Sequence, residues 1–424
     1  NQKKIIKEIN SDLKSEYRMF RLLQGDVGSG KTIISFVAAS SVISSNFQVS
    51  LMAPTEILAK QHYELACKIF KTTNINIELL TGKSTYKDKK KISEKLLSGE
   101  INFLIGTHAL FQKNISFKNL GLVIIDEQHK FGVKQRIKLA DKGGIDCDIL
   151  LMTATPIPRT LILTIFGDMD ISRLTEKPSN RKEILTLIKP DKKIDEVLTF
   201  IKNQINNRNQ IFWICPLIEE SKKLQFEAVV KKYNHLSKIF PKKVGLIHGA
   251  LSKEEKDKVL NKFLNKSLQI LVSTTVIEVG VDLPNVNIIV IENSNKFGLS
   301  QLHQLRGRVG RGDKQGTCIL LYNSSLSESA KKRLRILKST NDGFYIADED
   351  MKLRGYGDVL GFQQSGAKDF KIADPIHHEE LFEIAEQNIK SIERNEKNFI
   401  KYTNLLKLFD KADIINEIST KKII

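Results

Sequence analysis

The segment Gly25-Asp26-Val27-Gly28-Ser29-Gly30-Lys31-Thr32 matches the pattern G-x-x-x-x-G-K-[ST] at every fixed position. A short apolar run, residues 19–23, precedes it, and the apolar run 33–39 follows it as the first turns of a buried helix. Glycines let such a loop curl until several backbone N–H groups and a helix N-terminus face one anion. The pattern therefore predicts that this loop binds a nucleoside triphosphate. Lys31 is expected to reach the β- and γ-phosphates, and the Thr32 hydroxyl to ligate magnesium.

Length and composition are those of a folded protein with two or three domains. The 424 residues exceed what one core usually holds, and 41% hydrophobic with 27% charged residues are globular values. No apolar run reaches 18 residues and no signal peptide is visible, so we expect a soluble, cytoplasmic protein without a membrane segment. The four cysteines are scattered without a C-x-x-C pair, which argues against a zinc site or a disulfide framework.

The net charge of +18 has two explanations. A pI near 9.5 suits a polyanionic partner such as nucleic acid. Lysine far outnumbers arginine, however, and isoleucine and asparagine are abundant, as an AT-rich genome would also produce. The charge alone does not decide between a nucleic-acid partner and a composition bias.

Short apolar runs alternate with longer amphipathic ones in two series, a pattern typical of buried parallel strands joined by helices. Only the first series contains a phosphate loop, so we expect a ligand held between two similar α/β lobes. The predicted strands of the first series are 19–23, 48–52, 76–80, 102–105, 120–125 and 148–152, and those of the second are 211–215, 244–247, 270–272, 286–291 and 317–322.

The predicted fold class is α/β, with two tandem parallel-sheet lobes and a helical C-terminal extension. Residues 178–181, Pro-Ser-Asn-Arg, indicate a linker. We place an ATP-binding lobe at 1–176, a second lobe at 177–326 and the extension at 327–424. A glycine-rich loop, residues 354–366, interrupts that extension.

Two adjacent carboxylates, Asp126 and Glu127, follow the predicted strand 120–125. At the end of a strand beside a phosphate loop, such a pair can divide two tasks. Asp126 is expected to hold magnesium and Glu127 to polarise the attacking water. Thr153 and Thr155 also follow a strand, and their hydroxyls are expected to hydrogen-bond the pair or link it to the second lobe.

The second lobe carries its own polar motif, Gln304-Leu305-Arg306-Gly307-Arg308-Val309-Gly310-Arg311. Arg308 and Arg311 are three residues apart, so on a helix they project from one face. We expect both to clamp the γ-phosphate as arginine fingers, with Gln304 in the same catalytic motif. The alternative is contact with nucleic-acid phosphates, which is the role expected of Arg306.

Small polar groups at further strand ends can grip phosphodiesters without reading bases. Each is a weak signal alone, and we expect them to act as a set. Asp282 is expected to contact the nucleotide ribose, and His303 to form hydrogen bonds rather than act as a base. The candidates for DNA contact are Thr81, Gly82, Thr107 and His108 in the first lobe, and Thr274 and Thr275 in the second.

Taken in order, these segments resemble the motifs of superfamily-two helicases. The segments 22–32, 126–133, 153–161 and 297–308 resemble the bacterial RecG family of ATP-dependent DNA helicases, and the resemblance covers nearly the whole chain. It implies two RecA-like lobes that use ATP and Mg²⁺. It also implies an ATP-driven double-stranded DNA translocase that remodels stalled forks and migrates Holliday-type junctions in recombination and repair.

The same resemblance implies roles that spacing alone does not. Gln2 matches an adenine-reading glutamine, and residues 353–366 match a translocation loop that follows a helical hairpin. Arg354 and Gln364 are the expected coupling residues of that loop. The implied partners are double-stranded and branched DNA and single-strand DNA-binding protein, with a monomeric enzyme on the bacterial nucleoid.

Three residues depart from the family pattern. Tyr356 and Gln363 stand where proline and arginine are usual, and Lys130 replaces an arginine, which is not equivalent at bidentate sites. The family's N-terminal wedge domain is not found in these 424 residues, and the chain begins with Asn1, so we expect an upstream segment.

Three other functions compete with this interpretation. A transcription-repair coupling translocase shares the C-terminal loop, but Gln128-His129 differs from its usual motif. An RNA-unwinding enzyme normally has Ala-Asp at that place. From another class, an ATP-gated DNA clamp would bind without processive work, although intact Lys31, Glu127 and Arg308 favour a motor.

Overall fold

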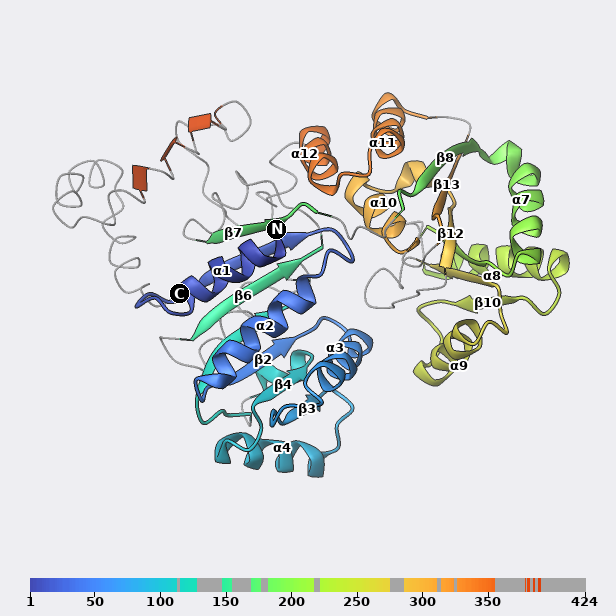
Figure 1. The fold of residues 1–424 in the computed structure, drawn as a ribbon. Coiled ribbons are helices and arrows are strands. Elements are labelled where there is room, and N and C mark those ends of the chain that lie inside the picture. The colour runs from blue at the N-terminus through green and yellow to red at the C-terminus, as the bar shows by residue number, and fades with distance from the viewer. Residues whose placement is uncertain are drawn as a thin grey trace.

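The computed structural model describes most of two sheet-containing lobes and two helices after them (Figure 1). The described residues are 1–112, 115–127, 147–154, 169–176, 182–216, 222–274, 286–310, 314–323 and 326–354, with a few positions between 378 and 389.

The first lobe is built on a seven-stranded parallel sheet in the order β3-β4-β2-β5-β6-β1-β7. The inner strands are apolar on both faces, which is why they read as continuous hydrophobic runs in the sequence. The strands are β1 (Phe20–Gly25), β2 (Gln48–Met52), β3 (Ile77–Leu80), β4 (Phe103–Gly106), β5 (Leu120–Ile125), β6 (Asp148–Thr153) and β7 (Asp170–Leu174).

Helices cover both faces of this sheet. Apolar side chains of α1 (Gln2–Asp12), α2 (Lys31–Ser44) and α3 (Glu56–Ile69) share one core, and those of α4 (Tyr86–Ser98) belong to the core on the other face. Helix α4 begins at a capping box between Thr85 and Asp88. The arrangement places three helix N-termini after strand ends, where a nucleotide can meet backbone N–H groups.

The second lobe repeats the plan with a six-stranded parallel sheet in the order β10-β11-β9-β12-β13-β8. Helices α7 (Ile194–Asn206) and α8 (Lys222–Ile239) cover one face, and α9 (Lys253–Leu264) and α10 (Leu299–Arg306) cover the other. The strands are β8 (Leu185–Pro190), β9 (Gln210–Cys215), β10 (Val244–Ile247), β11 (Ile270–Thr274), β12 (Val286–Ile291) and β13 (Thr317–Tyr322).

Two helices of the C-terminal extension join the core of the second lobe. Leu334 and Leu337 of α11 (Glu328–Ser339) and Ile346 of α12 (Gly343–Arg354) are buried in the same cluster as α10. Figure 1 shows α11 and α12 above α10, on the side that faces the first lobe. The glycine-rich loop from 355 onward lies outside the described residues.

The predicted fold class is confirmed, and β2, β5, β12 and β13 run over the predicted ranges. The sequence patterns missed β7 and β8, which carry mixed side chains and extend each sheet at one edge. The domain boundaries at 176 and 326 stay a prediction, and the proposed linker lies outside the described residues. Within the described part of the chain, no helix is long and apolar enough to cross a membrane.

Candidate nucleotide site and interlobe contacts

The loop after β1 is curled as the sequence pattern predicts. Gly28 and Gly30 have φ values of 81° and 97°, a left-handed conformation that glycine adopts at little cost, and α2 begins directly after them. Lys31 is buried and its Nζ donates to the carbonyl oxygens of Gly25, at 2.6 Å, and Asp26, at 3.0 Å. A bound phosphate would compete with these carbonyls for the ammonium group.

Gln2 lies over the same loop, although it comes 23 residues before its first glycine. Its Nε2 donates to the Ser29 carbonyl oxygen at 3.1 Å. A Cβ at Gly30 would displace that Nε2, and the φ of 97° at this position favours glycine in any case. The structure therefore places Gln2 beside the predicted phosphate loop, where the base of a nucleotide could be read.

The two carboxylates stand at the end of β5, beside the end of β6. His62 of α3 donates from Nε2 to Asp126 Oδ2 at 2.9 Å. Glu127 has a φ of 49°, and its Oε2 accepts a hydrogen bond at 3.2 Å from the Ala154 backbone N–H. Ala154, which directly follows β6, thus supports Glu127 through its backbone N–H.

Burial and neighbouring charges shift the pKa values of Asp126 and Glu127 in opposite directions. Burial raises the pKa of Asp126, but the hydrogen bond and charge of His62 and the charge of Lys31 bring it below its ordinary value. Burial, and then the charge of Asp126, raise the pKa of Glu127, only partly offset by Lys31, the Ala154 N–H and Arg308. A lowered pKa favours the ionised Asp126 that a cation ligand needs, and a raised pKa makes Glu127 the better proton acceptor.

Arg308 comes from the second lobe, yet its charge acts on Glu127 of the first. It follows α10, whose last turn also carries Gln304. The same helix brings His303 to Asp26 of the nucleotide loop, so Arg308 stays a candidate for an arginine finger that acts on a phosphate held by the other lobe. The second expected finger, Arg311, lies outside the described residues.

The expectation that Arg306 contacts DNA phosphates is contradicted. Its side chain is 2% exposed and donates to the carbonyl oxygens of Leu337, at 2.5 Å, and Thr340, at 2.8 Å. It also donates to His303 Nδ1 at 3.1 Å. The hydrogen bonds of the Arg306 guanidinium are therefore intramolecular, and they link α10 to the C-terminal end of α11.

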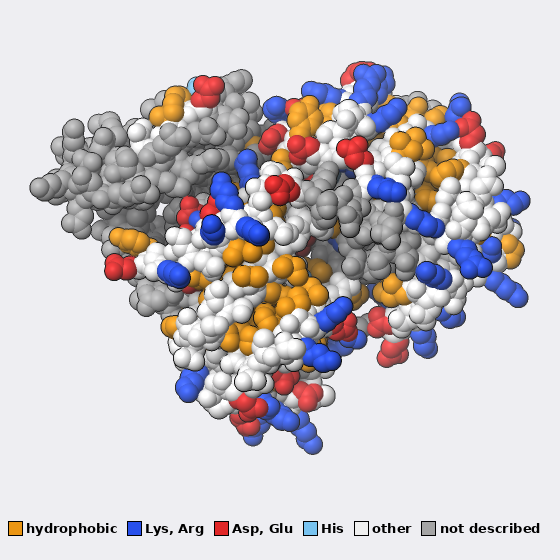
Figure 2. All heavy atoms as spheres, in the orientation of Figure 1, with side chains coloured by type: hydrophobic (Ala, Val, Ile, Leu, Met, Phe, Trp, Pro, Cys, Tyr) orange, Lys and Arg blue, Asp and Glu red, His pale blue; other side chains and the backbone are white. Residues whose placement is uncertain are grey.

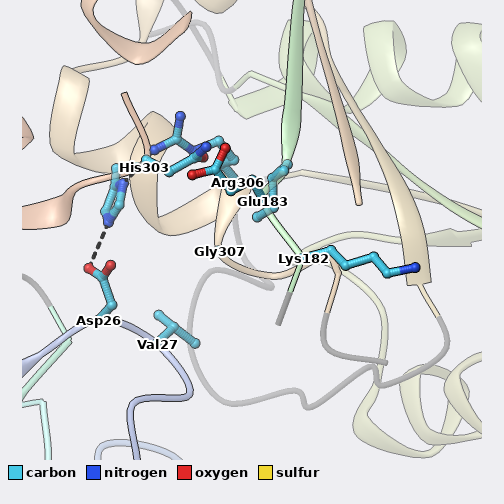
Figure 3. Close-up of a pocket in the computed structure, with 9 residues that line it drawn as sticks. Asp26, Val27, Lys182, Glu183, His303, Arg306 and Gly307 are labelled. Carbon is cyan, nitrogen blue, oxygen red and sulfur yellow. Dashed lines mark hydrogen bonds and ion pairs between the residues drawn. The ribbon is translucent and has the colours of Figure 1, made fainter. Parts of the chain in front are cut away.

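A second contact joins the lobes at the nucleotide loop. His303 Nε2 donates to Asp26 Oδ1 at 3.1 Å (Figure 3). The Arg306 guanidinium donates to Nδ1 of the same ring, so both ring nitrogens form hydrogen bonds and the orientation of the ring is fixed. This confirms His303 as a hydrogen-bonding side chain. A Cβ at Gly343, the first residue of α12, would collide with Asp26 Oδ1 and lie 2.8 Å from His303 Nε2. The pair lines a pocket whose walls come from both lobes, including Val27, Lys182, Glu183 and Gly307.

The predicted DNA-contact set divides by exposure. Thr81, Gly82 and His108 are accessible, and Gly82 lies close to His108, so the loops after β3 and β4 meet. Thr107 and Thr274 are buried, at 1% and 3% exposure, so their side chains do not offer the expected phosphate contact. Thr153, expected instead to support the carboxylate pair, is 0% exposed at the end of β6. The predictions for Thr155, Thr275, Asp282 and Gln364, and for the Arg354 side chain, fall outside the described residues.

His62 is a site residue that sequence reasoning missed. It lies 6% exposed in α3 and packs edge-on against Phe36 of α2. No spacing signal marks it, because its partner is 64 residues away along the chain.

The described residues offer few side chains that could bind a metal ion. Among the described residues, no group of three His, Cys, Asp or Glu side chains could hold a metal ion. Magnesium commonly keeps several waters and uses one carboxylate together with substrate phosphates. Thr32 and Asp126 fit that kind of site, because α2 and β5 bring both to the loop that carries Lys31.

Comparisons with known proteins match this arrangement along the chain. Residues 1–163 match the DEAD/DEAH box helicase family and residues 189–313 the helicase conserved C-terminal domain. Residues 340–413 match the C-terminal domain 3 of the ATP-dependent DNA helicase RecG. The chain therefore carries both helicase domains and a RecG-specific extension in order.

Individual relatives agree. The chain is 49% identical to the ATP-dependent DNA helicase RecG of Bacillus subtilis, across 92% of this chain and 57% of the relative. It is 48% identical to that of Thermotoga maritima, across 92% and 50%. A structure of RecG bound to a three-way DNA junction matches with a TM-score of 0.74 and 45% identity, across 90% of this chain and 50% of that one.

The chain spans about half the length of the curated relatives that it matches. A yeast Dbp5 structure, at 20% identity and a TM-score of 0.59, shares the fold. With the paired lobes, the nucleotide loop and the extension all matched, this chain belongs to the RecG family of superfamily-two helicases.

Proposed function

We propose that the chain is the motor of an ATP-dependent double-stranded DNA translocase that remodels stalled replication forks and migrates Holliday-type junctions. The observation that carries the proposal is the contact between the lobes at the nucleotide loop, where His303 of α10 bonds Asp26 at 3.1 Å and Arg308 follows the same helix. A site completed only when two lobes approach can convert hydrolysis into lobe movement. The related RecG structure is bound to a three-way DNA junction, which supports branched DNA as the partner.

The residues divide the chemistry as follows. Lys31 and the N–H groups of the loop from Gly25 to Thr32 hold the phosphates of ATP. When bound at Thr32 and Asp126, Mg²⁺ supplies positive charge to the phosphate oxygens. Glu127 orients a water molecule and takes its proton, and Arg308 stabilises the charge that develops on the transferred phosphoryl group.

The enzyme is further proposed to act as a monomer on double-stranded and branched DNA, with single-strand DNA-binding protein as a partner. Figure 2 shows Lys and Arg side chains spread over both lobes on the face displayed, mixed with acidic ones. The accessible Thr81, Gly82 and His108 lie at the carboxyl edge of the first sheet. Backbone and hydroxyl contacts there would grip the duplex without reading its sequence.

Duplex-stimulated ATP hydrolysis together with displacement of a triplex-forming strand tests this function. We expect both activities in the wild-type chain and neither in Glu127→Gln, which should still bind ATP. Hydrolysis without displacement would instead support the ATP-gated clamp. Displacement that requires RNA polymerase would support the transcription-repair coupling translocase.

The pH dependence of hydrolysis tests the role of Glu127. Because burial and Asp126 raise its pKa, the carboxylate accepts a proton at a higher pH than an ordinary glutamate. The rate of ATP hydrolysis should therefore be maximal at pH values above the raised pKa of Glu127, and it should fall as the pH drops through that pKa. We expect the acid limb of kcat to begin clearly above the usual glutamate pKa of about 4.3. An acid limb at or below that value would contradict the assignment.

The translocation loop gives a separate test. Arg354 and Gln364, the expected coupling residues, are replaced together by alanine. Because the loop is proposed to act on DNA and not on the nucleotide, ATPase should stay within about twofold of wild type while strand displacement falls at least tenfold. Equal loss of both activities with a lowered melting temperature would show that the loop is a structural brace.

A further inference from the structure

Arg21, on β1, is buried among three acidic side chains, two of which belong to α1. Its Nε donates to Asp12 Oδ2 at 2.5 Å, and its Nη1 donates to Ser172 Oγ at 2.8 Å. Ser172 in turn donates to Glu8 Oε2 at 2.7 Å. Asp170 lies 3.7 Å from Nη2. The guanidinium thus links the C-terminal half of α1 to two neighbouring strands, β1 and β7.

Arg21 and Ser172 form the buried centre of this cluster, and the acidic partners Glu8, Asp12 and Asp170 lie around it with side chains 33%, 23% and 46% exposed. The Arg21 and Ser172 residues are 8% and 2% exposed. A buried guanidinium that loses its partners costs more than an exposed one, so the network strongly favours one geometry. The planar guanidinium group of Arg21 donates hydrogen bonds in fixed directions, so it constrains the orientation of its partners, whereas the ammonium group of a lysine would not.

Apolar packing alone would not fix α1 so closely. Ile5 and Ile9 are the buried apolar residues of the helix, and hydrophobic burial is non-directional. A helix held only by such contacts can slide or turn slightly on its sheet. The Arg21 network supplies directional contacts at the Asp12 end of the helix, in addition to the hydrogen bonds of Asn10 with Ser41 and of Asn1 with Thr175.

The opposite end of α1 carries Gln2. Gln2, Ile5, Ile9 and Asp12 lie at spacings that place them along one side of the helix. The 11 residues form a rigid rod of about 16 Å, so a shift at Asp12 reaches Gln2 undiminished. The 3.1 Å hydrogen bond from Gln2 to Ser29 would be lost after a displacement of roughly 1 Å. Helix α1 packs against α2 and β7, and Figure 1 shows it directly below β7.

We propose that Arg21 is a positioning residue for base selection: it fixes α1 on β1 and β7 so that Gln2 stays over the nucleotide loop. The inference rests on the proposed ATP site, in which Gln2 reads the adenine. Arg21 itself touches no nucleotide, so its effect should concern the base and not the phosphates.

Binding of ATP, GTP and inorganic tripolyphosphate, measured by displacement of a fluorescent nucleotide, tests the proposal. Tripolyphosphate has no base and reports the phosphate loop alone. The variants are Arg21→Met, which keeps the length without the charge, and Arg21→Lys, which restores a charge without the fork. Lys4→Gln is the matched control, because it removes the exposed 3.9 Å ion pair of Lys4 with Glu8 from the same helix.

We expect Arg21→Met to reduce the preference for ATP over GTP about tenfold, the effect of one lost hydrogen bond, with tripolyphosphate affinity within about twofold. Arg21→Lys should recover part of the preference, and Lys4→Gln should keep it. In Gln2→Ala, the further change Arg21→Met should cause no additional loss of preference, because Arg21 acts through Gln2.

Two results would overturn the proposal. One is an unchanged ATP-to-GTP preference in Arg21→Met, and the other is an equal loss of affinity for all three ligands. Since the readout is binding, these results are independent of whether the chain hydrolyses ATP or moves DNA. Failure of the proposed function would appear in the hydrolysis and displacement assays instead.

Discussion

Lys31→Ala should abolish ATP hydrolysis, with a loss on the order of 10³-fold in kcat, while DNA affinity without nucleotide stays nearly unchanged. The structure gives the reason for the separation. Lys31 is buried inside the loop and bonded to the carbonyls of Gly25 and Asp26, so it has no surface to offer to DNA. Steady-state ATPase and fluorescence-anisotropy DNA binding measure the two effects.

Lys4→Gln provides the control for the loss of one positive charge in the same lobe, because Lys4 is exposed. Its turnover should match the wild type. If Lys31→Ala kept turnover within about tenfold of wild type, only about 1.4 kcal/mol of barrier would depend on this lysine. The loop would then not be the phosphate site.

Arg308→Ala should lower kcat by about 10³- to 10⁵-fold, the range for an arginine finger, with a much smaller effect on ATP affinity. We expect kcat to fall much more than ATP affinity because Arg308 is proposed to stabilise charge that develops during phosphoryl transfer, and not the charge of bound ATP. Arg308 follows α10, whose His303 bonds Asp26 of the nucleotide loop across the lobes, and its charge is the smallest of the causes that partly offset the raised pKa of Glu127. ATPase kinetics and equilibrium ATP binding, measured separately, check the prediction.

Arg335→Ala is a suitable control, because Arg335 is an exposed arginine on α11, which packs against the second lobe. It should leave kcat unchanged. If Arg308→Ala instead reduced the salt dependence of DNA binding with ATPase intact, Arg308 would be a phosphate-backbone contact.

The parts of the site formed by consecutive residues could be predicted from the sequence. The loop from Gly25 to Thr32 needs only local glycine geometry, and the position of Asp126 and Glu127 needs only the end of an apolar strand. Both signals lie within a short window. Parallel strands then bring their ends to one edge without further information.

The residues that the sequence did not reveal depend on contacts between distant segments. His62 meets Asp126 across 64 positions, and no local pattern distinguishes it from any other histidine of an amphipathic helix. The motif around Arg306 predicts a DNA contact because exposed arginines in such motifs meet phosphates. Arg306 is buried because the carbonyls of Leu337 and Thr340, 31 and 34 residues away, turn toward it.

Gly343 touches both halves of the Asp26–His303 pair, so the first residue of α12 stands where the nucleotide loop and the second lobe meet. A helix pivoted at that point would act as a lever. The 12 residues of α12 span about 18 Å from Gly343 to Arg354. A tilt of about 10° about Gly343 would therefore carry Arg354 roughly 3 Å, close to the 3.4 Å rise of one base pair. Because Asp350 of α12 accepts hydrogen bonds from the N–H groups of Leu299 and Ser300, such a tilt would carry α10 and α12 together as one unit.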